Sequence, residues 1–338
     1  MPALYHFIQD LPKADLHVHL EGTIEPEMLF LLAERNKVKI PYGNEEELRK
    51  AYHFEHLVDF LTVYYQGTRV IQQSEDFYDI TRAYLRKAAE ENTIHADIFI
   101  DPQTHLDKGI TLEMILEGVL PAAAEAQAQY GITTGLILCF LRHRPLSESL
   151  TILSEIGPLK AHFAAVGLAA KELGYPPKNF VKLYEMADKM GLKKTAHAGE
   201  EGPAFYIQEA IEFLHVDRID HGNSILDDPQ LVETVKNTQI PLTMCPLSNL
   251  HLNVIQNVTE HPIDRLLKRG LKVTINSDDP SYFGGYMNAN LKVVAETFNW
   301  GEKELLTVTQ NAFDVAYVNP DRRIRMNEIL RNFSQSRT

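Results

Sequence analysis

Clustered basic residues are what this sequence most clearly lacks. The 338 residues include 33 Lys and Arg against 46 Asp and Glu, giving a formal net charge of -13, and the Lys and Arg form no run. Contacts with nucleic-acid phosphates require clustered positive charge. The composition therefore argues against a nucleic-acid partner and favours a small molecule.

Long apolar runs and cysteine pairs are also missing. No stretch approaches the roughly 20 apolar residues of a membrane-spanning helix, and the segment Met1–Asp10 lacks the charged-then-apolar pattern of a signal peptide. Cys139 and Cys245 each lie in an apolar strand-like run, which predicts reduced core residues and neither a disulfide nor a metal pair. The sequence therefore predicts a cytoplasmic protein without a membrane partner.

Strand-like segments alternate with helical ones along most of the chain. Eight strand–helix repeats predict an α/β fold of the (β/α)8 TIM-barrel type, in which function lies at the carboxyl ends of the strands. No linker or low-complexity segment divides the chain, so residues 1–338 are predicted to form one barrel domain. The expected strands are Lys13–Leu20, Thr93–Ile100, Thr133–Leu141, Phe163–Leu168, Lys193–Ala198, Val216–His221, Ile240–Cys245 and Leu271–Ser277.

A long, mostly helical segment interrupts this alternation after the first strand–helix unit. It covers residues from about 37 to 92, which is too long for a plain connection. We interpret it as an insertion that roofs a pocket. Its residues Leu48, Phe54, Leu57 and Phe60 are expected to pack in the core, with an apolar wall over the ligand as the alternative.

The candidate chemistry begins at the end of the fifth expected strand. His197 lies at that strand end, and Glu200 follows three residues later in a turn loosened by Gly199 and Gly202. The Glu200 carboxylate therefore has room beside whatever His197 binds. A ligand residue and a proton-transfer group would then be neighbours.

Three other strand ends carry residues of the same kind. His17 and His19 are two apart on the first strand, so their side chains share one face. His221 ends the sixth strand, and Asp278 with Asp279 ends the eighth, which adjoins the first in a closed barrel. Three His and one Asp suit a divalent ion such as zinc, with one position open for water. Backbone-bonded strand histidines and a simple Asp-Pro turn are the alternatives, and the convergence of four strand ends favours the metal.

Four motifs carry a family resemblance over nearly the whole chain. They are His17–Gly22, His197–Glu200, Asp220–Gly222 and Ser277–Pro280, and together they resemble the adenosine and AMP deaminase family, a mononuclear zinc branch of the amidohydrolase barrels. Phe99–His105 and Tyr282–Tyr286 are similar to its adenine deaminase subgroup. The resemblance implies hydrolytic deamination of a 6-aminopurine, in purine salvage, with one Zn²⁺ per chain. Fe²⁺ or Mn²⁺ suits the same ligands.

The resemblance also implies a role for each residue. Zinc lowers the pKa of its bound water towards about 7, and His221 takes or orients the proton of that water. Protonated Glu200 donates to the purine N1 as C6 is attacked, and Asp279 bonds N7. The implied zinc ligands are His17, His19, His197 and Asp278.

The choice of substrate depends on three positions. Glu21 stands where adenosine deaminases usually have an Asp that contacts ribose, and its longer side chain is expected to crowd that space. Glu172 is expected to accept a hydrogen bond from the free base, with a solvated loop charge as the alternative. Both favour adenine over adenosine. Ala169 stands where the family commonly has Asp, which leaves an N6-substituted adenine open.

Two rival functions use the same residues. A dinuclear amidohydrolase would bridge two metals through a carboxylated Lys171 on the fourth strand, although such an enzyme does not need Glu200. A purine-binding protein that has lost the chemistry should lack a ligand or the acid, and this chain retains all of them. Counting the metal ions per chain separates these alternatives.

Overall fold

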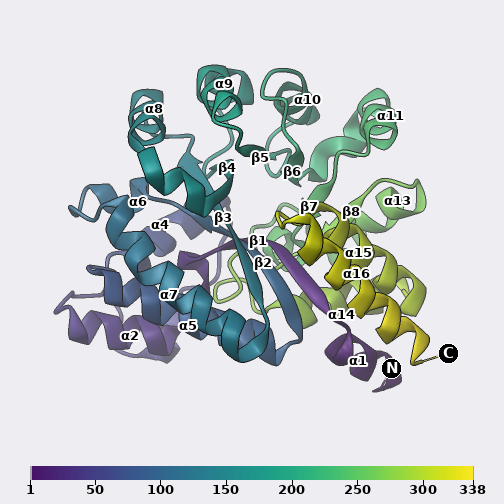
Figure 1. The fold of residues 1–338 in the computed structure, drawn as a ribbon, viewed down its shortest axis with the longest axis horizontal. Coiled ribbons are helices and arrows are strands. Elements are labelled where there is room, and N and C mark those ends of the chain that lie inside the picture. Colours follow the sequence, from purple (N-terminus) through teal and green to yellow (C-terminus); the bar gives the residue numbers. More distant parts are fainter. Residues whose placement is uncertain (1, 338) are drawn as a thin grey trace.

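The computed structural model describes residues 2–337 and arranges eight parallel strands side by side in the order β1 to β8. Figure 1 shows the helices surrounding these strands. The predicted barrel of the amidohydrolase type is confirmed. The strands are β1 (Lys13–His19), β2 (Thr93–Ile100), β3 (Thr133–Leu141), β4 (Phe163–Ala169), β5 (Lys193–Ala198), β6 (Arg218–His221), β7 (Leu242–Met244) and β8 (Val273–Ile275).

The helices account for most of the remaining chain. The α-helices are α1 (Pro2–Asp10), α2 (Pro26–Arg35), α3 (Glu45–Lys50), α4 (Leu57–Thr68), α5 (Ser74–Glu90), α6 (Gln103–Leu106), α7 (Leu112–Tyr130), α8 (Leu146–Glu155), α9 (Val181–Lys189), α10 (Ala204–Glu212), α11 (Pro229–Thr238), α12 (Pro246–His251), α13 (Ile263–Lys268), α14 (Met287–Phe298), α15 (Glu302–Val315) and α16 (Pro320–Gln335). Short 3-10 turns are η1 (Glu21–Thr23), η2 (Gly157–His162), η3 (Pro177–Phe180), η4 (Asn223–Asp227) and η5 (Val258–Glu260). None of the helices within residues 2–337 is long and apolar enough to cross a membrane.

The barrel closes where the end of β8 meets β1. The backbone N–H of Asp278 donates to the His17 carbonyl at 2.8 Å, and the His19 N–H donates to the Asp278 carbonyl at 3.0 Å. One step earlier, the Asn276 side chain accepts from the Leu16 N–H at 2.9 Å in place of a backbone pair. The strand β8 ends at Ile275, just before this side-chain contact, and so ends two residues earlier than predicted. These hydrogen bonds fix Asp278 directly beside the two histidines of β1.

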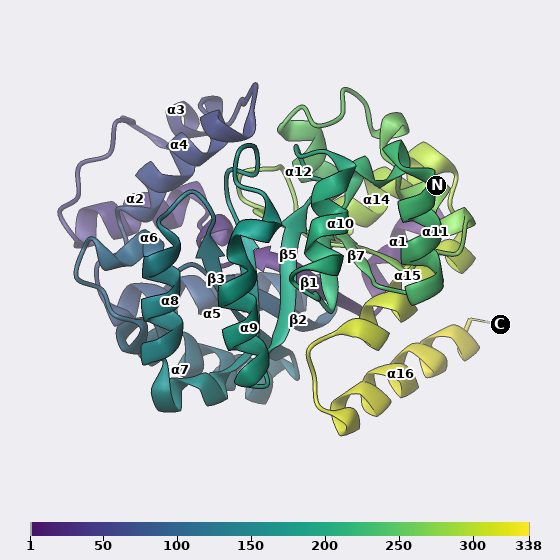
Figure 2. The same cartoon turned by 90° about the horizontal axis from the view of Figure 1, so that it is seen from above.

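The predicted insertion has two parts with different positions. Helix α5 packs against α7 and β2 and so belongs to the barrel's outer layer. Helices α3 and α4 lie on the same side of the barrel as α12 (Figure 2), where the Asn253 side chain donates to the Phe54 carbonyl at 2.8 Å. Helix α4 lines the pocket at the barrel mouth, and the segment just before it is hydrogen-bonded to the segment after α12.

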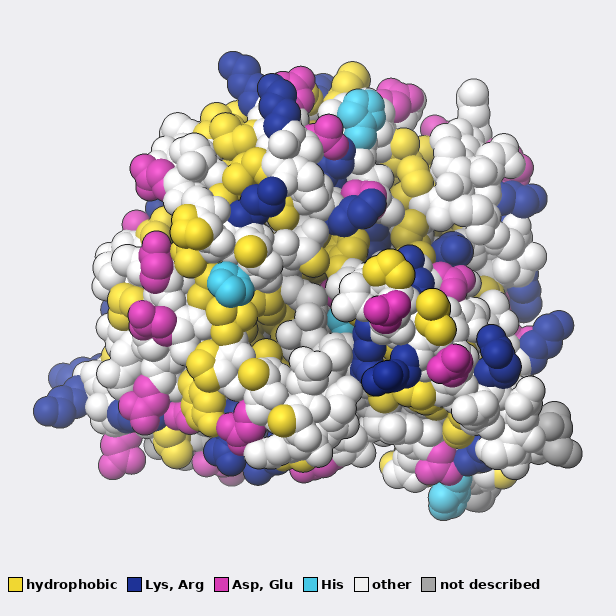
Figure 3. Space-filling view, in the orientation of Figure 1, with side chains coloured by type: hydrophobic (Ala, Val, Ile, Leu, Met, Phe, Trp, Pro, Cys, Tyr) yellow, Lys and Arg dark blue, Asp and Glu magenta, His cyan; other side chains and the backbone are white. Residues whose placement is uncertain are grey.

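Both cysteines are buried and unpaired, as predicted. On the face drawn in Figure 3, acidic and basic side chains are interspersed, with no large patch of either sign. This distribution agrees with the composition, because a nucleic-acid surface needs basic side chains gathered on one face. The chemistry of the molecule is instead concentrated in the barrel mouth.

Candidate active site

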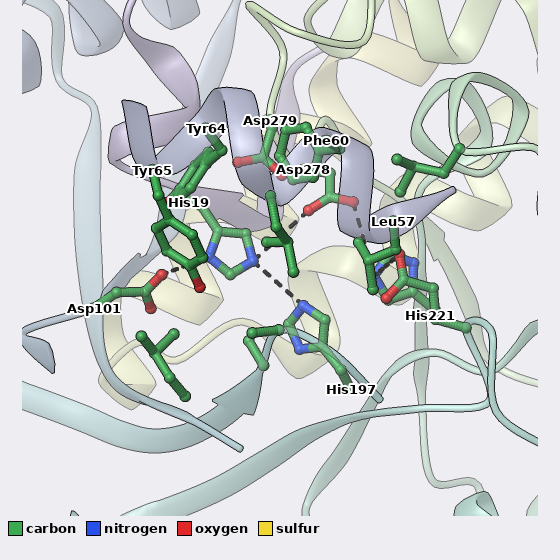
Figure 4. Close-up of a pocket in the computed structure, with 16 residues that line it drawn as sticks. His19, Leu57, Phe60, Tyr64, Tyr65, Asp101, His197, His221, Asp278 and Asp279 are labelled. Atoms are coloured by element: carbon green, nitrogen blue, oxygen red, sulfur yellow. Dashed lines mark hydrogen bonds and ion pairs between the residues drawn. The ribbon is translucent and has the colours of Figure 1, made fainter. Parts of the chain in front are cut away.

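The four predicted ligands converge at the carboxyl end of the barrel. The His197 Nε2 lies 3.1 Å from the His17 Nε2 and 3.3 Å from the His19 Nε2, and the Asp278 Oδ1 lies 3.4 and 3.7 Å from those two nitrogens. A tetrahedral zinc ion with ligands at about 2.1 Å separates them by about 3.4 Å. The donor set and its spacing therefore fit zinc. Figure 4 shows His19, His197 and Asp278 pointing towards one another.

Three buried groups hold the ligand rings from behind. The Nδ1 of His17 lies 3.1 Å from the Thr243 Oγ1. Asp101 and Asp220 lie behind His19 and His197, with Oδ2–Nδ1 distances of 3.6 and 3.5 Å respectively. Such partners orient imidazole ligands and raise their basicity. Sequence reasoning missed Asp101 and Asp220 in this role, although both stand at strand ends inside motifs that it quoted.

Two of the site residues have an unusual backbone conformation. Asp278 has φ of 63° and His221 has φ of 66°, both in the left-handed region. Such a conformation costs of order 1–3 kcal/mol in a residue other than glycine and persists where the surroundings enforce it, often at functional sites. Here it turns both side chains into the barrel mouth. His221 Nε2 then lies 3.6 Å from Glu200 Oε1 and 3.7 Å from Asp278 Oδ2.

Glu200 is a buried carboxyl group beside the ligand cluster. Burial is the main cause that raises its pKa well above the usual value, and the charges of Asp278 and Glu172 raise it further. This shift favours the protonated form of the side chain. A protonated carboxyl group facing a pocket is a proton donor, which is the role predicted for it.

Glu172 lies elsewhere than predicted. Its carboxylate accepts hydrogen bonds from four successive backbone N–H groups, those of residues 199 to 202, at 2.6, 3.0, 3.0 and 2.7 Å. The side chain is fully buried, with Arg142 Nη1 at 3.8 Å. Both expectations were wrong, because the charge is neither solvated nor free to accept from a base. Glu172 instead fixes the turn that carries Glu200.

Replacing Glu172 by Gln is expected to lower the free energy of unfolding by about 3 kcal/mol, because a carboxylate oxygen is lost and Arg142 stays buried without its counter-charge. The turnover number should fall as well, since the Glu200 turn loosens. Urea denaturation measures the first effect. The exposed Glu185→Gln on α9 is the control, and equal stability of the two variants would contradict this role.

Glu21 is also directed away from the pocket. Its Oε1 accepts from His105 Nε2 at 2.7 Å, and His105 Nδ1 lies 3.0 Å from Lys108 Nζ. The Lys108 ammonium in turn donates to the carbonyl of Thr68 at the end of α4, at 2.7 Å. The expectation that Glu21 crowds the ribose space directly was wrong. Glu21 instead anchors helix α4, which roofs the pocket, through the side chains of His105 and Lys108.

Asp279 lies in the pocket, as predicted, against the backbone of Gly22. A β-carbon added at Gly22 would lie 1.9 Å from the Asp279 Oδ1, so only glycine leaves room for this carboxyl group. Burial raises the pKa of Asp279 well above its usual range, and the nearby Asp278 charge raises it further. A protonated Asp279 can donate a hydrogen bond to a ring nitrogen.

Gly22→Ala is therefore expected to displace Asp279 and to lower kcat/KM roughly 100-fold, the cost of misplacing a positioning group by about 1 Å. The metal content should not change, because Asp279 is not among the ligands. Steady-state kinetics with metal analysis tests this. Gly301→Ala serves as the control, since its β-carbon would meet only an ordinary contact at 3.7 Å. Unchanged kinetics in Gly22→Ala would remove Asp279 from the substrate site.

The pocket combines this polar floor with an apolar roof. Helix α4 contributes Leu57, Phe60, Leu61, Tyr64 and Tyr65 (Figure 4). Ala169 and Ala170 at the end of β4 form part of the wall. Within residues 2–337, no Lys or Arg lines the pocket. A planar, uncharged aromatic ring matches these walls better than a phosphate does.

Eight parallel strands with a His3Asp cluster at their carboxyl ends define an amidohydrolase-type barrel, and the four side chains of the cluster could hold a metal ion. The adenosine deaminase family model matches residues 12–332. The chain belongs to this family and is an enzyme.

Three known proteins illustrate the relationship. The chain is 45% identical to an adenine deaminase of Hahella chejuensis over 95% of this chain and 96% of that protein. The solved adenine deaminase of Arthrobacter aurescens is 41% identical, with a TM-score of 0.94 over 96% of this chain and 99% of that one. An amidohydrolase of Burkholderia ambifaria with bound Zn is 27% identical, with a TM-score of 0.89, over 99% and 95% of the two chains.

Proposed function

We propose that this enzyme catalyses the zinc-dependent hydrolytic deamination of adenine to hypoxanthine and ammonia, as part of purine salvage. The observation that carries the proposal is the pair of buried carboxyl groups, Glu200 and Asp279, which face the His3Asp cluster across one pocket and whose pKa values are raised by burial. Relatives named adenine deaminase, about 45% identical over nearly the whole chain, support adenine as the substrate. The Zn bound in the Burkholderia ambifaria structure supports the metal.

Asp279 binds and orients the substrate, and Glu200 transfers protons. Asp279, protonated, donates to the purine N7 and orients the ring so that C6 faces the ligand cluster. Glu200 donates its proton to N1, so that the ring does not build up negative charge as C6 is attacked. When bound, the metal lowers the pKa of water and supplies the nucleophile. The 6-amino group leaves as ammonia after it gains a proton.

The pocket also bears on the competing substrates. A nucleotide would bring a phosphate into a pocket that no Lys or Arg lines within residues 2–337. Burying a charged group without a paired cationic side chain costs free energy. Adenosine and N6-substituted adenines remain the alternatives, and both are larger than adenine. The small side chains of Ala169 and Ala170 line the wall of the pocket.

A dinuclear centre finds little support in the arrangement. Lys171 is exposed to solvent on the turn after β4 and does not line the pocket. A carboxylated lysine that bridges two metals must instead lie inside the ligand cluster. We therefore assign one metal ion per chain.

The reaction in water enriched in heavy oxygen tests the proposal. We expect one heavy oxygen at C6 of the hypoxanthine formed and one ammonia released for each adenine consumed. Mass spectrometry and an ammonia assay measure both products. Adenine recovered unchanged by the zinc-loaded enzyme would overturn the proposal.

A further inference from the structure

His221 is the first of three buried polar side chains in a line that continues through Asn249 to His261, on the side of His221 opposite the pocket. His221 Nδ1 lies 3.3 Å from the Asn249 Nδ2, and the Asn249 Oδ1 lies 3.1 Å from the His261 Nε2. The three residues come from the end of β6, from α12 and from the turn before α13, and all are buried. Neither Asn249 nor His261 has a role in the site as described so far.

The far end of the line determines how the protons are placed. The backbone N–H of Ile263 donates to the Nδ1 of His261 at 3.2 Å. That nitrogen is therefore an acceptor and carries no proton. Burial lowers the pKa of His261 to about 3, so the ring is neutral and its single proton is on Nε2. His261 Nε2–H then donates to Asn249.

Asn249 transmits this choice to His221. Its oxygen accepts from His261, so its amide NH2 faces His221 and donates to Nδ1. The opposite amide orientation would place an N–H donor against the His261 Nε2–H, leaving His261 with two acceptor nitrogens or a donor–donor clash. The hydrogen bonds are therefore satisfied by only one orientation of the Asn249 amide and one tautomer of each histidine.

We propose that Asn249 and His261 are positioning residues that hold His221 in the tautomer with its proton on Nε2, the nitrogen that faces the reacting atoms. This inference rests on the proposed deamination. His221 then presents a hydrogen-bond donor towards Glu200 and Asp278 and orients the attacking water by donating to its oxygen. It does not remove the proton of that water.

The proton balance follows from this assignment. As the water oxygen bonds to C6, its proton passes to the Glu200 carboxylate, which has given its own proton to N1. Glu200 Oε1 lies 3.6 Å from His221 Nε2 and so faces the same space. The same carboxyl group then supplies the proton with which ammonia leaves, and it takes the remaining proton from the C6 hydroxyl as the carbonyl of hypoxanthine forms, which restores the protonated acid. No proton has to pass through His221 in this sequence.

Nuclear magnetic resonance of the zinc-loaded enzyme with ¹⁵N-labelled histidine tests the tautomer without any turnover. The His221 signals are identified by their absence in His221→Gln. We expect Nε2 to be protonated and Nδ1 to be unprotonated, and these states have widely separated ¹⁵N shifts. A protonated Nδ1 in the wild-type enzyme would overturn the proposal, whatever the substrate is.

Two variants of His261 test its consequence for the reaction. His261→Leu removes the donor to Asn249, and we expect kcat to fall about 10- to 100-fold with little change in KM or zinc content. His261→Gln keeps an N–H donor and should recover most of the loss, as well as the His221 tautomer. The exposed His162→Leu is the control. An unchanged tautomer and kcat in His261→Leu would overturn the relay, whereas an inactive wild-type enzyme with the expected tautomer would overturn only the proposed substrate.

Discussion

Glu200→Gln is expected to lower kcat for adenine by about 10²- to 10⁴-fold, the range over which a positioned acid or base contributes to catalysis. The amide has nearly the same shape as the protonated carboxyl group, but it cannot transfer a proton to N1. The side chain is not among the ligands, so zinc content and thermal stability should remain those of the wild type. Steady-state kinetics with metal analysis measures these quantities.

Glu201→Gln is the matched control for this experiment. Glu201 is adjacent in the chain, is only partly buried, and its backbone N–H also donates to Glu172 at 3.0 Å. A general effect of amide substitution in this turn would therefore appear in both variants. Near-normal turnover in Glu200→Gln, or an equal loss in Glu201→Gln, would remove Glu200 from its assigned role.

Removing the metal is expected to abolish activity, because the nucleophile then lacks the ion that lowers its pKa. Incubation with a chelator followed by dialysis yields the metal-free enzyme, and activity is measured as zinc is added back. We expect recovery to be complete at one ion per chain. The melting temperature should rise as zinc binds, since the ligand cluster exists only in the folded state.

The same titration addresses the competing interpretations. Parallel additions of Fe²⁺ and Mn²⁺ rank the ions that the His3Asp cluster accepts, which depends on more than the general affinity order. A requirement for two ions per chain would support the dinuclear alternative. Full activity in the metal-free enzyme would contradict the assignment of His17, His19, His197 and Asp278 as catalytic metal ligands.

The positions of the four predicted metal ligands could be predicted from the sequence, because functional residues in a barrel of this type lie at the carboxyl ends of the strands. His17 and His19 share a strand face through their spacing alone. Asp278 meets them because β8 adjoins β1 in a closed barrel. Predicting those positions requires only the order of the strands, and local sequence patterns predict that order.

The supporting residues were harder to predict because their partners lie far away in the sequence. Glu172 binds backbone groups 27 to 30 residues later, which no local pattern reveals. Glu21 contacts His105, 84 residues away, and so faces the roof instead of the substrate. Side-chain direction at such positions depends on tertiary packing, and residue type alone predicted it wrongly.

The roof illustrates an intermediate case. The sequence indicated a helical insertion over the pocket, with four apolar residues expected in the core and an apolar wall as the alternative. All four residues are buried in the core, and two of them, Leu57 and Phe60 on α4, also line the pocket. An amphipathic pattern identifies the apolar face of a helix, but it does not say which neighbour that face meets.

The ultraviolet spectrum of the zinc-loaded enzyme, mixed with adenine and separately with adenosine, tests the central claim most directly, because loss of the 6-amino group shifts the purine absorption. We predict a rapid shift with adenine and almost none with adenosine. A rapid shift with adenosine and none with adenine would contradict the free-base assignment, and no shift with either, in an enzyme that holds its metal, would contradict deamination of both.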